Sequence, residues 1–159
     1  MHQQLDHVSH VCFIYDVERL EWARQEFSDA FGIDDWDGPV DLAAFGVLQT
    51  QSVSAGIEIL APLTDTGPFR EYLDTHGEGF FALIYGVRDL NAAVRSAQER
   101  GARPALDAEG RPLLIDALTI DNGAPAYPSW RERLRTYRET PFEPVAGVNV
   151  YLGEIEPLA

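Results

Sequence analysis

The sequence contains no lysine, because all 12 of its basic residues are arginine, and it carries 26 acidic residues for a formal net charge of −14. The missing lysine excludes a mechanism that uses a lysine nucleophile to form a Schiff base. The shortage of positive charge disfavours nucleic acids and anionic membranes as partners, since both are polyanions. The acidic surface is a common means of solubility, and it also suits a cationic ligand.

Cysteine and long apolar runs are also scarce. The single cysteine, Cys12, cannot close a disulfide within the chain, which favours a reducing, cytoplasmic location. No apolar run approaches the roughly 18 residues that span a bilayer. The N-terminal residues MHQQLDHVSH lack the basic and apolar regions of a signal peptide. We therefore expect a cytoplasmic protein of one domain, residues 1–159, without a membrane span.

An internal repeat organises the chain. Residues 8–15 alternate as a strand, Asp16 is the predicted N-cap, and apolar residues then recur at helical spacing as far as Gly32. The same series returns with a strand at 80–87, a capping Asp89 and a helix that ends at Gly101. The repeat indicates two copies of one unit that pack together, since neither half is large enough to bury both faces of its own sheet.

Each copy is followed by residues able to form about three more strands. In the first half the clear candidates are 47–53 and 56–63, and in the second half they are 103–106, 113–120 and 145–155. The sequence thus predicts an α+β fold of two βαβββ modules, at residues 5–63 and 80–159, joined by a linker at 64–79. The acidic segment 34–46 is expected to be an irregular connection.

Residues 123–144 break the symmetry of the repeat. We expect them to form an insertion that interrupts the final hairpin, and they hold four arginines and four aromatic residues: Arg131, Arg133, Arg135, Arg138, Tyr127, Trp130, Tyr137 and Phe142. Two interpretations stay open for this segment. It is either a solvated hairpin extension or a functional lid with an anion-binding rim.

A duplicated βαβββ unit resembles the vicinal oxygen chelate superfamily of glyoxalases, bleomycin-resistance proteins and extradiol dioxygenases. Three segments of the sequence are similar to the methylmalonyl-CoA epimerase-like branch of this superfamily. They are SHVCFIYDVERLEWARQEFSDAFGI, GIEILAPL and FREYLDTHGEGFFALIYGVRDLNAAVRSAQERGA. The resemblance covers residues ~5–122, returns at GVNVYLGEIEP, and is poor at 123–144. It implies two curled mixed sheets around a cleft, and a homodimer.

Metal-dependent members of that family bring four ligands to the cleft, one from each of four strands. The resemblance maps the first ligand to His10, with His7 as a rival register, and the second to Glu58. The third and fourth positions correspond to Ala82 and Tyr151, which are poor ligands. The resemblance therefore implies no metal and no cofactor, and any metal would have to be held by His10 and Glu58.

Because side chains alternate along a strand, the residues that share a face with these positions are also expected to line the cleft. His10, Glu58 and Tyr151 are the predicted catalytic residues, for general acid–base chemistry and for stabilising an oxyanion. Glu58 would have a raised pKa in such an apolar place unless His10 pairs with it. The remaining face residues are predicted to bind the substrate: Cys12, Leu60, Phe80, Ala82, Ile84 and Asn149.

Two classes of function fit these residues. The first is a metal-independent isomerase, epimerase or lyase that acts on a small carbonyl-containing molecule. The second is a non-catalytic protein of the bleomycin-resistance kind, which sequesters a cationic aromatic drug. The charge of −14 and the aromatic residues Trp36, Tyr127, Trp130 and Tyr137 fit the second class, whereas the arginines of 131–138 do not.

Overall fold

A computed structural model describes residues 5–159, so the first four residues of the predicted domain 1–159 lie outside the described part of the chain. The chain divides into two compact units. The first unit is His10–Phe81, and the second is Ala82–Ala159 together with residues 5–9. Among the described residues, no helix is long and apolar enough to cross a membrane.

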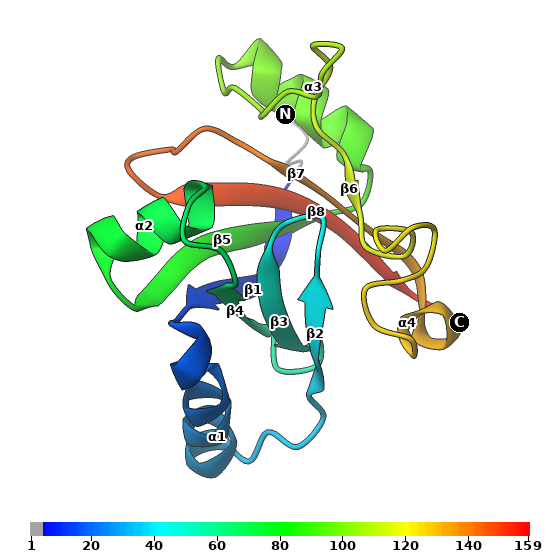
Figure 1. Ribbon diagram of the computed structural model, residues 1–159. Coiled ribbons are helices and arrows are strands. Elements are labelled where there is room, and N and C mark those ends of the chain that lie inside the picture. Colours follow the sequence, from blue (N-terminus) through cyan, green and yellow to red (C-terminus); the bar gives the residue numbers. More distant parts are fainter. Residues whose placement is uncertain (1–4) are drawn as a thin grey trace. The chain divides into compact units, whose positions relative to one another are not determined.

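The first unit is built on a mixed sheet (Figure 1). Strand β1 (Leu5–Ile14) enters it from the second unit and pairs in parallel with β4 (Ile57–Pro62). Strand β3 (Val47–Ser52) pairs antiparallel with both β4 and β2 (Asp37–Leu42). The helical elements of this unit are η1 (Val17–Arg19), α1 (Leu20–Phe31) and α2 (Pro68–His76).

The second unit repeats that pairing scheme. Strand β5 (Gly79–Val87) pairs in parallel with β8 (Asn149–Pro157), which pairs antiparallel with β7 (Leu134–Pro141), and β7 pairs antiparallel with the short β6 (Ile115–Asp116). Its helices are α3 (Leu90–Glu99) and the single turn α4 (Trp130–Arg133). Figure 1 shows β8, in red, alongside β7. The predicted α+β fold with two βαβββ modules is confirmed.

Helix α1 covers one face of the first sheet with large side chains. Leu20 and Ala23 are buried against Ile59 and Ala61 of β4, and aromatic residues of α1 and the strands fill the rest of this contact. The rings of Phe13 and Phe27 lie 5.2 Å apart. The helix ends as predicted at Gly32, whose left-handed φ of 70° lets its N–H bond the carbonyl oxygen of Ser28.

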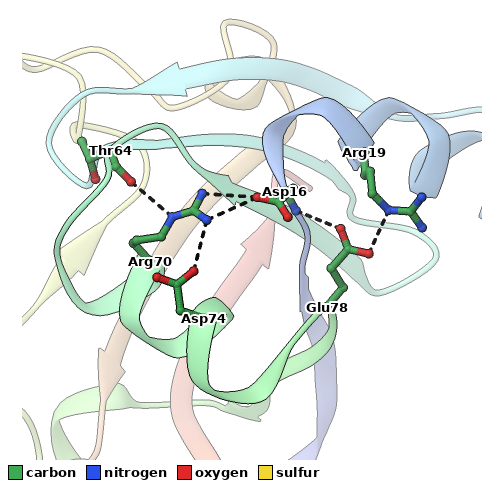
Figure 2. Close-up of polar contacts among 6 residues, drawn as sticks. All are labelled: Asp16, Arg19, Thr64, Arg70, Asp74 and Glu78. Carbon is green, nitrogen blue, oxygen red and sulfur yellow. Dashed lines mark hydrogen bonds and ion pairs between the residues drawn. The ribbon is translucent and has the colours of Figure 1, made fainter.

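The two predicted aspartate caps have different outcomes. Asp89 caps α3 as expected, since its Oδ1 accepts a 2.9 Å hydrogen bond from the N–H of Ala92. Asp16 makes no side-chain cap, and the chain continues into the 3-10 turn η1. Its carboxylate accepts instead from Arg70 of α2, at 3.3 Å (Figure 2). A charged partner outside the helix therefore replaces the local capping bond.

The same cluster fastens α2 and the following turn to the start of η1. Glu78 Oε1 accepts from the N–H of Asp16 at 3.2 Å, while its Oε2 accepts from Arg19 at 2.8 Å. Arg70 also reaches Asp74 one turn along α2, at 3.4 Å (Figure 2). Apart from the Arg70–Asp74 contact within α2, these contacts join residues more than fifty positions apart in the sequence, and all of them belong to the first unit.

Five expectations for the strands need correction. The segment 34–46 contains strand β2, held to β3 by the ladder and by a 2.6 Å bond from Thr50 Oγ1 to the carbonyl oxygen of Asp37. The predicted strand 113–120 shortens to β6, and 103–106 forms only isolated bridges. Strand β8 begins at Asn149 because 145–148 is a turn. The predicted insertion 123–144 supplies β7, so the final hairpin is present.

Candidate functional site

The first unit brings three predicted site residues together on neighbouring strands. The register of β1 and β4 places Cys12 beside Glu58. His10 Nε2 lies 3.2 Å from Glu58 Oε2, and the Cys12 thiol donates to Glu58 Oε1 at 3.4 Å. The His10 side chain is 2% exposed and that of Glu58 12%. A carboxylate thus sits nearly out of water with a partner on each oxygen, as a buried charge requires.

These residues occupy the sheet face that α1 does not cover. Because side chains alternate along a strand, Phe13 and Ile59 point towards α1, and their neighbours His10, Cys12 and Glu58 point the other way. Leu60 shares this second face and is 3% exposed. The predicted division of β1 into two faces matches this arrangement.

His10, not His7, is the histidine that meets Glu58. His7 lies before the first unit, its side chain is 64% exposed, and its Nδ1 is 3.7 Å from Asp6. Its ring stands over the backbone of Gly86, where an added Cβ would come within 2.5 Å of it. The glycine at position 86 therefore makes room for the His7 ring within the second unit.

Sequence reasoning missed Gln51 of β3. The antiparallel register pairs Gln51 with Glu58, so the two side chains share one face of the sheet, and Gln51 is 1% exposed. A buried amide beside a buried carboxylate adds a polar group to the site. The alternating polar residues Gln49 and Gln51 were the available signal, within a strand that was otherwise predicted correctly.

The second unit carries the other predicted residues on β5 and β8. Ala82 is opposite Asn149 and Ile84 is opposite Tyr151, so the four share the sheet face that α3 leaves uncovered. Ala82 and Ile84 are buried, whereas Asn149 and Tyr151 are partly exposed. Phe80 precedes them at the end of the first unit and is 44% exposed.

Glu139 of β7 is a second residue that the sequence did not reveal. It pairs with Gly153 of β8 and is 8% exposed, on the same face as Ile84 and Tyr151. An added Cβ at Gly153 would lie 3.0 Å from Ile84 and 3.5 Å from Glu139 Cγ, so the glycine lets these side chains approach each other. Glu139 was overlooked because 123–144 was expected to be an insertion instead of a strand.

The four-ligand metal set of the resembling family does not fit these residues. His10 and Glu58 are bonded to each other, and the positions expected to supply the other ligands hold Ala82 and Tyr151. Within residues 5–159, no three His, Cys, Asp or Glu side chains are placed to hold a metal ion. Of the four positions that the resemblance assigns to metal ligands, two therefore carry side chains that commonly bind metal ions, His10 and Glu58.

Three aromatic residues and one arginine of 123–144 make contacts within the second unit. Tyr127, Trp130 and Tyr137 are buried in one stack, with ring centroids 4.5 and 4.6 Å apart. Arg138 donates to Glu154 at 2.8 Å, and Glu154 also accepts from the N–H of Leu90 at 3.0 Å. Glu154 thus supports the start of α3, on the face opposite Tyr151.

Comparison with known families places residues 9–113 within one sequence family, described as the glyoxalase/bleomycin resistance protein/dioxygenase superfamily. The match begins within β1 and extends beyond α3, and it therefore includes both His10 and Glu58. A comparison with curated protein sequences finds no match.

Solved structures with the same fold cover nearly the whole chain. Methylmalonyl-CoA epimerase from Mycobacterium tuberculosis superposes with a TM-score of 0.69 at 20% identity, over 100% of this chain and 93% of that one. A hypothetical protein from Bacillus halodurans gives 0.65 at 17% identity, over 96% of each chain. A variant of Streptomyces coelicolor methylmalonyl-CoA epimerase in complex with 2-nitronate-propionyl-CoA gives 0.62 at 17% identity, over 94% and 97%.

Proposed function

Because the chain belongs to the glyoxalase/bleomycin resistance protein/dioxygenase superfamily, we propose that it is a metal-independent isomerase, epimerase or lyase. Its substrate is a small molecule with a carbonyl group, and its reaction is a proton transfer next to that carbonyl. The observation that carries the proposal is the His10–Glu58 pair, with Nε2 and Oε2 3.2 Å apart on adjacent parallel strands.

The pair has the properties of a proton-transfer couple. Glu58 takes a proton from the carbon next to the carbonyl, while His10 holds the carboxylate in place and can share that proton. Each carboxylate oxygen has two lone pairs, so the bonds from His10 and Cys12 leave Glu58 able to accept from a substrate. Little water reaches the pair, which strengthens electrostatic interactions there.

The substrate class follows from the chemistry of the pair and from the names of similar structures. A carboxylate base without a metal needs a substrate whose α-proton is already acidic. Thioesters and keto compounds meet that need. The similar structures include epimerases named for methylmalonyl-CoA, a thioester, which supports an acyl thioester as the first candidate. The predicted role of Tyr151 in stabilising the oxyanion, and the predicted homodimer, remain parts of this proposal.

The alternative of a drug-sequestering protein is weaker. Its support was a set of aromatic side chains to stack on a cationic drug, but Tyr127, Trp130 and Tyr137 stack on one another and are at most 3% exposed. Trp36 donates from Nε1 to Ser28 and packs beside α1. The acidic net charge and the family description, which includes bleomycin resistance proteins, continue to favour this alternative.

Proton exchange in D₂O tests the proposal directly. The intact protein is incubated with a panel of acyl-CoA thioesters and keto acids, and deuterium uptake at the α-carbon is followed by NMR. We expect exchange into at least one compound. Glu58→Gln should slow that exchange by about 10²–10⁴-fold, because a glutamine cannot accept the proton.

Glu71→Gln is the matched control, because it makes the same Glu-to-Gln replacement at an exposed position of α2 in the same unit. It should exchange at the rate of the unaltered protein. Undiminished exchange by Glu58→Gln contradicts the role of Glu58. Exchange into no compound, together with tight binding of a cationic aromatic drug, would favour the sequestering alternative.

A further inference from the structure

We propose that the second unit carries a separate binding site for a long-chain carboxylate, on the α3 side of its sheet. A pocket of about 650 Å³ lies there, between α3, strands β5 and β8 and the turn that joins β7 to β8. This volume is within the range of small-molecule pockets, roughly 300–1,000 Å³. Tyr151 and Ala82 occupy the opposite face of the same sheet, so this pocket is distinct from the site proposed above.

The pocket exists because α3 presents small side chains to the sheet. Ala93, Ser96 and Ala97 lie on one stripe of the helix and line the pocket from one side. Leu83 of β5 and Val150 of β8 are on the sheet side and are only partly buried. The short side chains of the helix do not reach the branched side chains of the sheet, so the space between them stays open and its walls are apolar. A larger side chain on the helix would fill this space.

The lining selects an aliphatic ligand. Apart from Arg100, Ser96 and the phenol of Tyr85, its side chains are hydrocarbon, including Phe142, Val145 and Val148 of the β7–β8 connection. Val145 is 52% exposed, so part of this apolar wall is open to water. An alkyl chain along this wall would remove that apolar surface from water.

Arg100 determines the charge of the ligand. Of the described residues that line the pocket, it is the single charged one, and it is exposed at the end of α3. Its guanidinium donates to the hydroxyl and the carbonyl oxygen of Ser96, one turn back, and no ion pair joins it to an acid within residues 5–159. In a protein of charge −14, an arginine that makes no ion pair among the described residues and lies beside an apolar pocket is suited to a ligand's carboxylate.

Dodecanoate is the probe, measured by calorimetry with the full chain below the micelle concentration. We expect saturable binding of one molecule per chain. In a series of shorter acids the affinity should rise about fourfold for each added methylene until the pocket is filled, because each buried methylene contributes a constant transfer free energy. Dodecanol, which lacks the charge, should bind about tenfold more weakly.

Two arginines on one helix provide the decisive comparison. Arg100→Gln should weaken dodecanoate binding about tenfold and leave dodecanol unaffected, because only the carboxylate contact is lost. Arg95→Gln removes the same charge from an exposed position of α3 that does not line the pocket, and should change neither ligand. Equal effects of the two variants would show a general charge effect and overturn the proposal.

Ala97→Phe tests the pocket itself by filling it. It should abolish binding of both ligands while the α-proton exchange reaction continues, which keeps this proposal separable from the proposed function. If dodecanoate does not bind to the unaltered protein, the proposal is wrong. The proposal is also contradicted if Ala97→Phe changes the oligomeric state and no fatty acid binds to the unaltered protein. That result would mean that a second copy of the chain covers the apolar wall.

Discussion

The two units use one topology for two different helix–sheet contacts. Beneath α1 the space is filled by aromatic and branched side chains, with Phe13 and Phe27 in contact. Beneath the second half of α3 the helix offers Ala97 and Ser96, and a pocket remains. A repeated βαβββ order therefore sets where the helix lies, while side-chain volume decides whether the contact is a closed core or an open site.

The opposite faces of the two sheets differ as well. In the first unit, β1 and β4 present His10, Cys12 and Glu58, which bond to one another. In the second, β5 presents Ala82 and Ile84. The His10–Glu58 pair thus lies on the first unit, whereas β5, the matching strand of the second unit, supplies apolar surface. The predictions below test how far each difference extends, beginning with the largest expected effect.

Replacing His10 tests whether the ionisable pair acts as a unit. His10→Gln should slow α-proton exchange by about 10²–10⁴-fold, because Glu58 loses the group that orients it and shares the proton. The measurement is the same deuterium uptake by NMR. His76→Gln, at an exposed histidine stacked on Tyr72 in α2, should leave the rate unchanged. A His10 variant of normal rate would make the pair structural only.

Tyr151→Phe tests whether the second unit takes part in the chemistry. Loss of one hydrogen bond to a developing oxyanion should lower the rate by about 10²–10³-fold with little change in substrate affinity. Steady-state kinetics on the compound that exchanges fastest separates the two quantities. An effect on affinity alone would reduce Tyr151 to a binding residue.

A pair of variants compares the filled and the open helix–sheet contacts. Phe27→Ala should lower the free energy of unfolding by about 2–3 kcal/mol, because it leaves a cavity in a half-buried aromatic contact. Ala97→Leu should change it by less than about 0.5 kcal/mol, although such enlargement of a packed core usually costs 1–3 kcal/mol. Urea denaturation measures both. A large cost for Ala97→Leu would mean that the contact beneath α3 is already full.

The smallest effect concerns the turn at Asp107, which belongs to the second unit. The backbone N–H of Arg111 donates to this carboxylate at 2.9 Å and lowers its pKa, with a further contribution from the Arg111 side chain. The stabilisation is complete above the ordinary carboxyl pKa and disappears as the pH falls through the lowered value. Asp107→Asn should therefore unfold more easily than the unaltered protein at neutral pH, and this difference should shrink towards about pH 3.

Much of the local structure follows from residue pattern. The alternation in β1, the Asp89 cap and the glycine ends at Gly32 and Gly101 all have short-range causes, and the structure bears them out. The errors have long-range causes. Asp16 pairs with Arg70, 54 residues away, in place of capping its own turn. Strand β7 was missed because its arginines and its tyrosine are suited equally to a surface loop and to a strand packed on one side.

The candidate site shows the same division. His10 and Glu58 were identified by resemblance and by strand parity, whereas Gln51 and Glu139 emerged only with the strand register. Register depends on which strands meet, and a shift of one residue would turn each side chain to the other face. No local pattern in β3 or β7 contains that information.

By itself, the sequence determined that a strand followed by a helix occurs twice, which residues of β1 share a face, and that the two helices end at Gly32 and Gly101, because these features depend on residue type and periodicity. The tertiary structure decided that His10 and Cys12 share the two oxygens of Glu58, that Trp130 is buried, and that a pocket remains beneath α3. Each of these is a matter of distance or volume between segments far apart in the chain. These distances and volumes are set only when the segments pack together, because the packed side chains then either fill the space between the segments or leave it open.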